Sequence, residues 1–170
     1  MKLESIPAFR GKHVNVVVET PLGSCFKYAY DPVMDVMKIK HQLPKGYFFA
    51  FNFGFIPNTF AEDGDPMDVI VYSSEHSLSG CLMECRVIGA LIANQKEDGK
   101  TIRNDRIIVV PAGVKMYNSI KNTRDIDQRV LKQYENFFES YENYRGISFK
   151  AIKWIPSKQA LTSIKKSLMK

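Results

Sequence analysis

The sequence predicts a mainly β (α+β) fold, in which strands form a closed or nearly closed β-barrel and two helices pack outside it. Short runs of β-branched and aromatic residues, separated by Gly and Pro turns, fill the first two-thirds of the chain. Helical periodicity appears only in the last third. The chain has 170 residues, of which 45% are hydrophobic, so it is long enough to bury a core. We therefore expect a single domain over residues 1–170.

The strands are expected in the following order along the chain. The first covers residues 13–19, which are rich in Val, and the second covers residues 27–30. A third strand follows an Asp-Pro turn. It covers residues 36–39, and the remaining strands are placed at 69–72, 83–92, 107–110 and 148–154.

Two helices are expected near the end of the chain. In the first, apolar residues recur at steps of three and four from position 126 to position 141. Asp125 and Gln128 are predicted to form the capping box at its start. The second helix begins at Ser157. Its apolar face consists of Ala160, Leu161, Ile164 and Leu168.

Composition and charge argue against several classes of protein. No apolar stretch approaches the ~20 residues that a membrane span needs, and the first seven residues lack the apolar core of a signal peptide. Cys25, Cys81 and Cys85 are an odd number without framework spacing, which indicates a reducing cytoplasm; the last two are expected half-buried in a strand. Much of the net charge of +6 lies in the terminal helix. Because no continuous basic stripe is present, nucleic acid is not an expected partner.

The most informative segment is the hexapeptide Asp63-Gly64-Asp65-Pro66-Met67-Asp68, which precedes an apolar run. Gly64 and Pro66 bend the chain, and such a turn can aim the three carboxylates into one small volume. Hard oxygen ligands that converge in this way suit Mg²⁺ or Mn²⁺. The same residue types are also common in acidic surface turns. The hexapeptide alone leaves both interpretations open.

Three further segments accompany this turn, which we call the Asp turn. Phe51-Asn52-Phe53-Gly54-Phe55-Ile56 lies just upstream, Glu19 and Lys27 lie before that, and Arg106 opens a later apolar strand. In this order and spacing the chain resembles the soluble family I inorganic pyrophosphatases. Their signature is an Asp-Gly-Asp-Pro-x-Asp-Val turn after an aromatic Asn-Tyr-Gly-Tyr-Ile segment. The resemblance covers nearly the whole chain and implies an OB-like closed β-barrel with two flanking helices.

The resemblance also implies an activity, that of an inorganic diphosphatase. In this hydrolase water attacks pyrophosphate and two phosphates are released, with Mg²⁺ as the cofactor and Mn²⁺ or Zn²⁺ as substitutes. On the matching positions, Asp63 and Asp68 would ligate metal ions, and Glu19 would serve an outer metal ion. Asp65 would help to take the proton from the attacking water.

The family pattern assigns phosphate binding to Lys27, Arg106 and Tyr141. Periodicity alone places Tyr141 on the apolar face of its helix, so core packing is an equally good interpretation of that residue. Glu19 and Lys27 also fit ordinary polar positions beside a turn. Arg106 is a cation that opens a barrel strand, and we expect it at the mouth of the barrel.

Several positions depart from the family pattern at the expected site. Phe53, Ala29 and Glu142 stand where the family has a Tyr, a Glu and a Lys. The family's Arg on the strand after Lys27 falls at His41, or at Lys40 if the alignment shifts by one. Other cations that could replace part of the lost charge are Lys96, Lys100, Arg103, Arg145 and Lys150.

A further metal ligand of the family falls at Asn104, and a shift of one residue would let Asp105 serve instead. The acidic segment Glu97-Asp98-Gly99 is a candidate for the remaining outer carboxylate. A hydrogen bond to a charged group contributes about 1.5–3 kcal/mol, so several such losses together could reduce the rate strongly. The sequence therefore predicts a divergent member of the family.

The predicted function is the metal-dependent hydrolysis of pyrophosphate by a cytoplasmic enzyme. One alternative is the hydrolysis of another phosphoanhydride, such as a nucleotide or a short polyphosphate. A second alternative is a catalytically inactive binding protein with the same fold. The resemblance also implies a homo-oligomer, with a hexamer favoured over a dimer, and no membrane partner.

Overall fold

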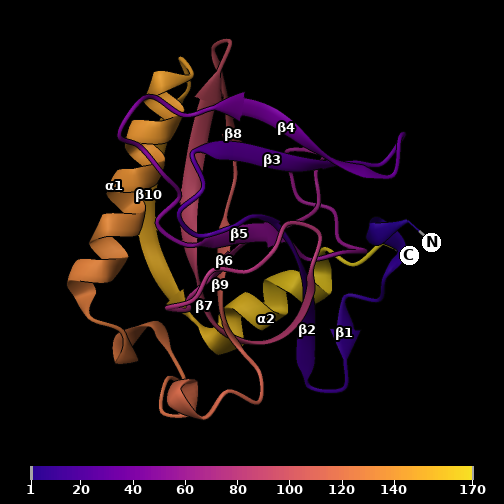
Figure 1. The fold of residues 1–170 in the computed structure, drawn as a ribbon. Coiled ribbons are helices and arrows are strands. Elements are labelled where there is room, and N and C mark those ends of the chain that lie inside the picture. Colours follow the sequence, from indigo (N-terminus) through magenta and orange to yellow (C-terminus); the bar gives the residue numbers. More distant parts are fainter. Residues whose placement is uncertain (1, 170) are drawn as a thin grey trace.

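The computed structural model describes residues 2–169 of the chain, apart from the side chain of Glu97. The helices are α1 (Gln128–Tyr144) and α2 (Ser157–Lys166), and short 3-10 turns occur at Leu3–Ser5, Lys115–Tyr117 and Thr123–Asp125. Figure 1 shows these elements along the chain. The strands are β1 (Phe9–Arg10), β2 (His13–Thr20), β3 (Phe26–Asp31), β4 (Val36–Gln42), β5 (Asn52–Phe55), β6 (Asp68–Val71), β7 (Leu82–Glu97), β8 (Lys100–Arg103), β9 (Arg106–Pro111) and β10 (Ser148–Pro156).

Five strands form a closed ring in the order β2-β5-β6-β9-β7. The ring closes because β2 pairs with β5 on one side and with β7 on the other. Strands β6 and β9 run parallel, and the other four pairs in the ring are antiparallel. Strand β1 adds to β2, while β8 and β10 add to β7. The predicted fold, mainly β with a closed ring of strands and two helices, is confirmed.

The core consists of two apolar clusters, one packed against each helix. Side chains of β6 and β9 alternate between them. Ile70 and Ile108 belong to the cluster that includes α1, whereas Val69 and Ile107 belong to the cluster that includes α2. Figure 1 shows the two helices at different sides of the strands. Burial on both faces explains why these strands read as continuous apolar runs rather than as alternating patterns.

Gly54 allows β2 and β5 to approach each other closely. A Cβ atom at this position would lie 1.9 Å from the backbone oxygen of Val17. Real Cβ atoms do not approach backbone oxygens so closely, so this part of the ring requires glycine. Strands β3 and β4 form a separate two-stranded antiparallel sheet beside the ring (Figure 1).

The structure corrects the predicted start of the first helix. Helix α1 begins at Gln128 and is capped by Asp127, whose carboxylate accepts a hydrogen bond from the backbone N–H of Arg129 at 2.9 Å. Asp125 forms a capping box with Asn122 around the preceding 3-10 turn. The predicted box was wrong because the apolar periodicity continues from this turn into the helix.

Other local predictions were incomplete. Strands β1, β5 and β8 were not predicted, because they are short and, unlike β6, contain no run of apolar β-branched residues. The prediction of two half-buried strand cysteines was wrong, because Cys85 lies in β7 but is fully buried, and Cys81 is exposed and precedes that strand. Leu168 lies beyond the end of α2. Within residues 2–169, no helix is both long and apolar enough to cross a membrane.

Candidate active site

The first two candidate residues meet where β2 ends. A β-bulge between Val18 and Thr20 leaves Glu19 outside the regular register with β5. Bulges of this kind re-aim a side chain. The Glu19 carboxylate accepts hydrogen bonds from Lys27 Nζ at 2.9 Å and from the backbone N–H of Tyr30 at 2.8 Å. This buried pair links the β3–β4 sheet to the ring.

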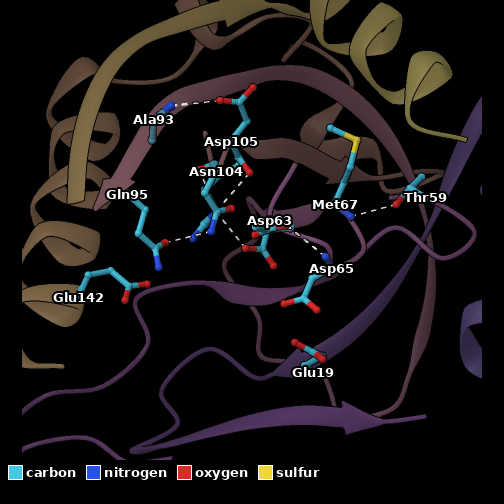
Figure 2. A network of polar contacts seen from close by, with 12 residues as sticks. Glu19, Thr59, Asp63, Asp65, Met67, Ala93, Gln95, Asn104, Asp105 and Glu142 are labelled. Carbon is cyan, nitrogen blue, oxygen red and sulfur yellow. Dashed lines mark hydrogen bonds and ion pairs between the residues drawn. The ribbon is translucent and has the colours of Figure 1, made fainter. Parts of the chain in front are cut away.

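The Asp turn lies between β5 and β6 and is held at its base by a buried threonine. Thr59 Oγ1 accepts a hydrogen bond from the backbone N–H of Met67 at 2.9 Å (Figure 2). Within the turn, Asp63 Oδ1 accepts a hydrogen bond from the backbone N–H of Asp65 at 3.2 Å. Gly64 between them has a φ of +91°, which favours glycine. The local sequence therefore determines the shape of the turn.

Asp68 and Arg106 meet because β6 and β9 are parallel neighbours. The two residues are register partners, and Arg106 Nη1 lies 3.0 Å from Asp68 Oδ2. The guanidinium also donates to the backbone and side-chain oxygens of Asn104 and lies over the rings of Phe53 and Phe138. Arg106 is only 3% exposed. The oxygens of Asn104 and the carboxylate of Asp68 together surround this buried charge.

Helix α1 contributes Tyr141 and Glu142 to the site. The Tyr141 hydroxyl forms a hydrogen bond of 2.8 Å with His41 Nε2, and its ring packs against Phe49. The Glu142 carboxylate is buried and pairs with Arg145 at 2.7 Å. Both interpretations of Tyr141 therefore apply, since its ring belongs to the core while the residue borders the site.

These elements enclose a cleft of about 510 Å³. Figure 2 shows Glu19 and Asp65 on one side of it and Glu142 on the other. The cleft brings together residues that are more than 100 positions apart in the sequence. Of the eight predicted site residues, seven line it: Glu19, Lys27, Asp63, Asp65, Asp68, Arg106 and Tyr141.

Asp105 is not brought to the cleft. Its carboxylate accepts a hydrogen bond from the backbone N–H of Ala93 at 3.2 Å and pairs with Arg103 at 2.8 Å (Figure 2). Asn104 and Arg106 face the cleft. Because consecutive side chains of an extended chain point to opposite sides, Asp105 between them points away. The shift that would have made Asp105 a metal ligand does not occur, and Asn104 occupies the lining position.

The structure also decides between Lys40 and His41. The register of β3 and β4 shifts after Lys27, which leaves Lys40 as the extra residue of a bulge. Lys40 lines the cleft. His41 instead stacks on Tyr141, with ring centroids 5.6 Å apart.

The departures from the family pattern lie inside the cleft, since Phe53, Ala29, Asn104 and Glu142 all line it. Among the five proposed replacement cations, Arg145 lines the cleft and the other four do not. Asp98 is exposed in the β7–β8 turn and does not line the cleft, and the side chain of Glu97 is outside the described part of the chain.

Gln95 of β7 lines the cleft and was missed by the sequence analysis. Its Oε1 accepts a hydrogen bond from Asn104 Nδ2 at 3.0 Å, as Figure 2 shows. No motif in the sequence marks this residue. Only the packing of β7 beside the segment that leads into β9 brings the two amides together.

Burial shapes the electrostatics of the cleft. It raises the pKa of Asp68 to about 6, although the nearby Arg106 opposes this change. Burial also raises the pKa of Asp63. It raises the pKa of Tyr141 as well, so that the phenol keeps its proton. Desolvated carboxylates are stabilised by a nearby cation, and the hard oxygen donors of this set fit a divalent metal ion.

The carboxylates do not, however, converge on one point. Among residues 2–169, no three His, Cys, Asp or Glu side chains are close enough to hold one metal ion as they stand. The sequence left open whether the three carboxylates of the Asp turn share one small volume; they line one cleft but do not form such a group as they stand. Like charges repel one another, and Asp68 and Glu19 are each drawn to a cationic side chain.

The cleft combines carboxylates that suit a divalent cation with fixed cationic side chains that suit an anion. Metal-dependent enzymes that act on phosphate groups have both features. Comparison with known proteins agrees. The sequence model of the family described as inorganic pyrophosphatase matches residues 16–170. The inorganic pyrophosphatase of Thermus thermophilus is 35% identical over 155 residues, which cover 89% of this chain and 86% of that protein. The inorganic pyrophosphatase of Saccharolobus solfataricus is 32% identical over 158 residues, with coverage of 91% and 90%.

The solved structures give the same result. The crystal structure of inorganic pyrophosphatase from Thermus thermophilus matches with a TM-score of 0.90 at 32% sequence identity, covering 98% of this chain and 97% of that chain. The chain therefore belongs to the soluble family I inorganic pyrophosphatases, which are metal-dependent hydrolases. The resemblance seen in the sequence is confirmed.

Proposed function

We propose that this chain hydrolyses inorganic pyrophosphate to two phosphates with Mg²⁺ as its metal ion, and that Mn²⁺ or Zn²⁺ can substitute. One observation carries the proposal. Asp63, Asp65 and Asp68 line the same cleft as the buried cations Lys27 and Arg106. Family membership supports the same reaction.

Asp63, Asp68 and Glu19 are the proposed metal ligands. All three offer the oxygen atoms that Mg²⁺ prefers. When bound, Mg²⁺ would neutralise charge on the phosphate oxygens and acidify the attacking water. Asp105 is not included, because its carboxylate is held on the other side of the chain by Arg103.

The remaining side chains would position the substrate and move the proton. Asp65 is exposed in the Asp turn and is the proposed general base for the attacking water. Lys27 and Arg106 would bind phosphate oxygens. Their ion pairs with acidic partners, at 2.9 and 3.0 Å, hold both cations in place before the substrate arrives. Tyr141 keeps its proton and would donate a hydrogen bond to a phosphate oxygen.

Phosphate release from pyrophosphate tests this proposal. The wild-type protein, Asp65→Asn and Glu62→Gln are compared with Mg²⁺, the wild-type protein is also assayed with Mn²⁺ and with Zn²⁺, and ATP serves as a second substrate. Glu62 is a matched control, because it is an exposed carboxylate beside the Asp turn that does not line the cleft. Loss of a general base is expected to slow turnover about 100- to 10,000-fold, while Glu62→Gln keeps its activity. No turnover of pyrophosphate by the wild-type protein with any of the three metal ions would overturn the proposal.

Metal binding can be measured without turnover. A ligand that binds only the folded protein stabilises it by about 2.7 kcal/mol at 100 times its dissociation constant. Mg²⁺ is therefore expected to raise the thermal unfolding midpoint of the wild-type protein relative to EDTA. Asp68→Asn should lose most of this response, and Glu62→Gln should keep it. An equal response in all three proteins would contradict the assigned ligands.

We further propose that the chain is a single domain that assembles into a cytoplasmic homo-oligomer, a hexamer rather than a dimer. The match of the family model to residues 16–170 supports treatment of the chain as one domain. Sedimentation equilibrium measures the assembly directly. One chain has a mass of 19.4 kDa. A measured mass near six times that of one chain is expected, whereas a mass near twice that of one chain would favour the dimer.

A further inference from the structure

The end of the cleft beside α1 contains an ion pair that the proposed mechanism does not use. Glu142 Oε2 and Arg145 Nη1 are 2.7 Å apart. Both residues line the cleft, and Figure 2 shows Glu142 across it from Asp65. This region is therefore opposite the Asp turn, where the second half of an extended, charged substrate would lie.

The backbone around Arg145 is well fixed. Helix α1 ends there in a Schellman motif, in which the N–H of Gly146 donates to the carbonyl of Asn143 at 3.0 Å and the N–H of Ile147 donates to that of Glu142 at 2.9 Å. Gly146 has a φ of +77°, as this motif requires. Arg145 thus starts from a rigid position, and the C-terminal end of a helix dipole favours its positive charge.

Glu142 holds the Arg145 side chain from one side. Its own side chain is only 4% exposed, whereas that of Arg145 is 31% exposed. A buried carboxylate beside an anionic substrate would oppose binding unless it were neutralised. The ion pair neutralises it and uses one of the five N–H donors of the guanidinium. The Arg145 guanidinium also lies 5.6 Å from the centre of the Tyr141 ring, a further contact that restricts it.

The charge balance of the cleft makes this guanidinium important. Among the residues whose side chains the structure describes, six carboxylates line the cleft against four cations, Lys27, Lys40, Arg106 and Arg145. Lys27 and Arg106 are buried and pair with Glu19 and Asp68, which are proposed metal ligands, so both cations belong to the metal-binding half. Arg145, whose partner Glu142 is not a proposed metal ligand, and Lys40 are the other cations that line the cleft.

We propose that Arg145 binds the pyrophosphate phosphoryl group that lies away from the Asp turn, and that Glu142 is the positioning residue that holds Arg145 there. This inference rests on the proposed function and names a specificity determinant of the same site. Position 142, where the family has a Lys, carries no cation in this chain. The planar guanidinium of Arg145, which can donate two hydrogen bonds at once, binds phosphate in its place. The carboxylate at position 142 then serves to orient the arginine.

The test compares Arg145→Gln with Arg129→Gln, a matched control near the start of the helix that Arg145 caps; its side chain is 88% exposed and outside the cleft. Steady-state hydrolysis gives KM and kcat. Calorimetry with methylenediphosphonate, a pyrophosphate analogue that is not hydrolysed, gives the dissociation constant without turnover. Loss of a charge-assisted contact is expected to raise both KM and the dissociation constant about 10- to 150-fold in Arg145→Gln. Arg129→Gln should leave both unchanged.

A charge-transfer variant separates a binding role from a structural one. Glu142→Lys combined with Arg145→Gln removes the ion pair but returns a cation to the same end of the cleft. We expect this double variant to recover most of the analogue affinity that Arg145→Gln loses. Glu142→Gln alone, which leaves Arg145 charged but without its acidic partner, should weaken binding by less than Arg145→Gln does.

Two results would overturn the inference. One is an unchanged KM and an unchanged dissociation constant in Arg145→Gln. The other is a weakening in Arg145→Gln that the double variant fails to restore although it folds, as circular dichroism would show. A wild-type protein that binds the analogue but releases no phosphate would contradict the proposed function alone, because the binding measurements on Arg145 would stand without it.

Discussion

Replacement of Asp68 by asparagine should stabilise the metal-free protein at the same time as it abolishes activity. Burial raises the pKa of the Asp68 carboxyl from 3.8 to about 6, and this value already reflects the attraction of Arg106. Each tenfold change in proton affinity corresponds to about 1.4 kcal/mol, so keeping Asp68 ionised costs the folded state up to about 3 kcal/mol. The side chain is 24% exposed, and solvent screening reduces the expected gain to about 2 kcal/mol.

The sign follows from the direction of the pKa change. The folded protein binds the Asp68 proton more tightly than the unfolded chain, so the wild type loses stability as pH rises from about 4 to above 6. In Asp68→Asn the side chain at position 68 is neutral at every pH, so this variant does not lose stability in that way as pH rises. Its unfolding midpoint in EDTA at pH 8 should exceed that of the wild type by about 4–8 °C. Below about pH 4 the advantage should disappear.

Thermal unfolding in EDTA, followed by circular dichroism at pH 8 and pH 4, measures the effect. Asp65→Asn is the matched control, because Asp65 belongs to the same turn but is exposed. Its midpoint should stay within about 1 °C of the wild type, although it too loses activity. A lower midpoint for Asp68→Asn than for the wild type at pH 8 would refute the reasoning, since the loss of the Arg106 partner would then outweigh the relief of burial.

Three further substitutions test other parts of the structure. Gly54→Ala would place a Cβ atom 1.9 Å from the Val17 oxygen, so it should destabilise the ring by more than about 3 kcal/mol in urea unfolding. Phe53→Tyr should return a hydroxyl to the cleft wall and raise kcat/KM several-fold; a slower enzyme with the same unfolding midpoint would contradict this. Burial and nearby cations lower the pKa of His41, so the wild type should lose stability as pH falls below about 6.5, and His41→Gln should not.

Two controls accompany these variants. Phe48→Tyr adds the same hydroxyl at a side chain that is 55% exposed and outside the cleft, so kcat/KM should not change. His13→Gln removes a histidine of β2 that lies beside Glu84 rather than Tyr141, and it should leave the pH dependence due to His41 in place. If Gly54→Ala has the same midpoint of urea unfolding as the wild type, the close approach of β2 and β5 does not constrain the ring.

Local sequence was sufficient for the class of fold, the Asp turn and the family. The turn is shaped by neighbouring residues, through a hydrogen bond from the Asp65 backbone to the Asp63 carboxylate and a positive φ at Gly64. The apolar runs of β6 and β9 and the periodicity of α1 are likewise local signals. The family resemblance, which rests on these local motifs, pointed to eight site residues, and seven of them line the one cleft that the fold assembles.

Only the tertiary structure decided which of two adjacent residues faces the cleft. Because of a bulge in the β3–β4 pair, Lys40 rather than His41 points into the cleft. In the extended chain before β9, Asn104 rather than Asp105 points into it. The physical reason is the two-residue period of extended backbone, which sends a side chain to the opposite face when the register changes by one. Register depends on hydrogen bonds between strands that are distant in sequence, as does the meeting of Gln95 with Asn104. Those long-range contacts carry no local signature, so they had to be seen in the folded chain.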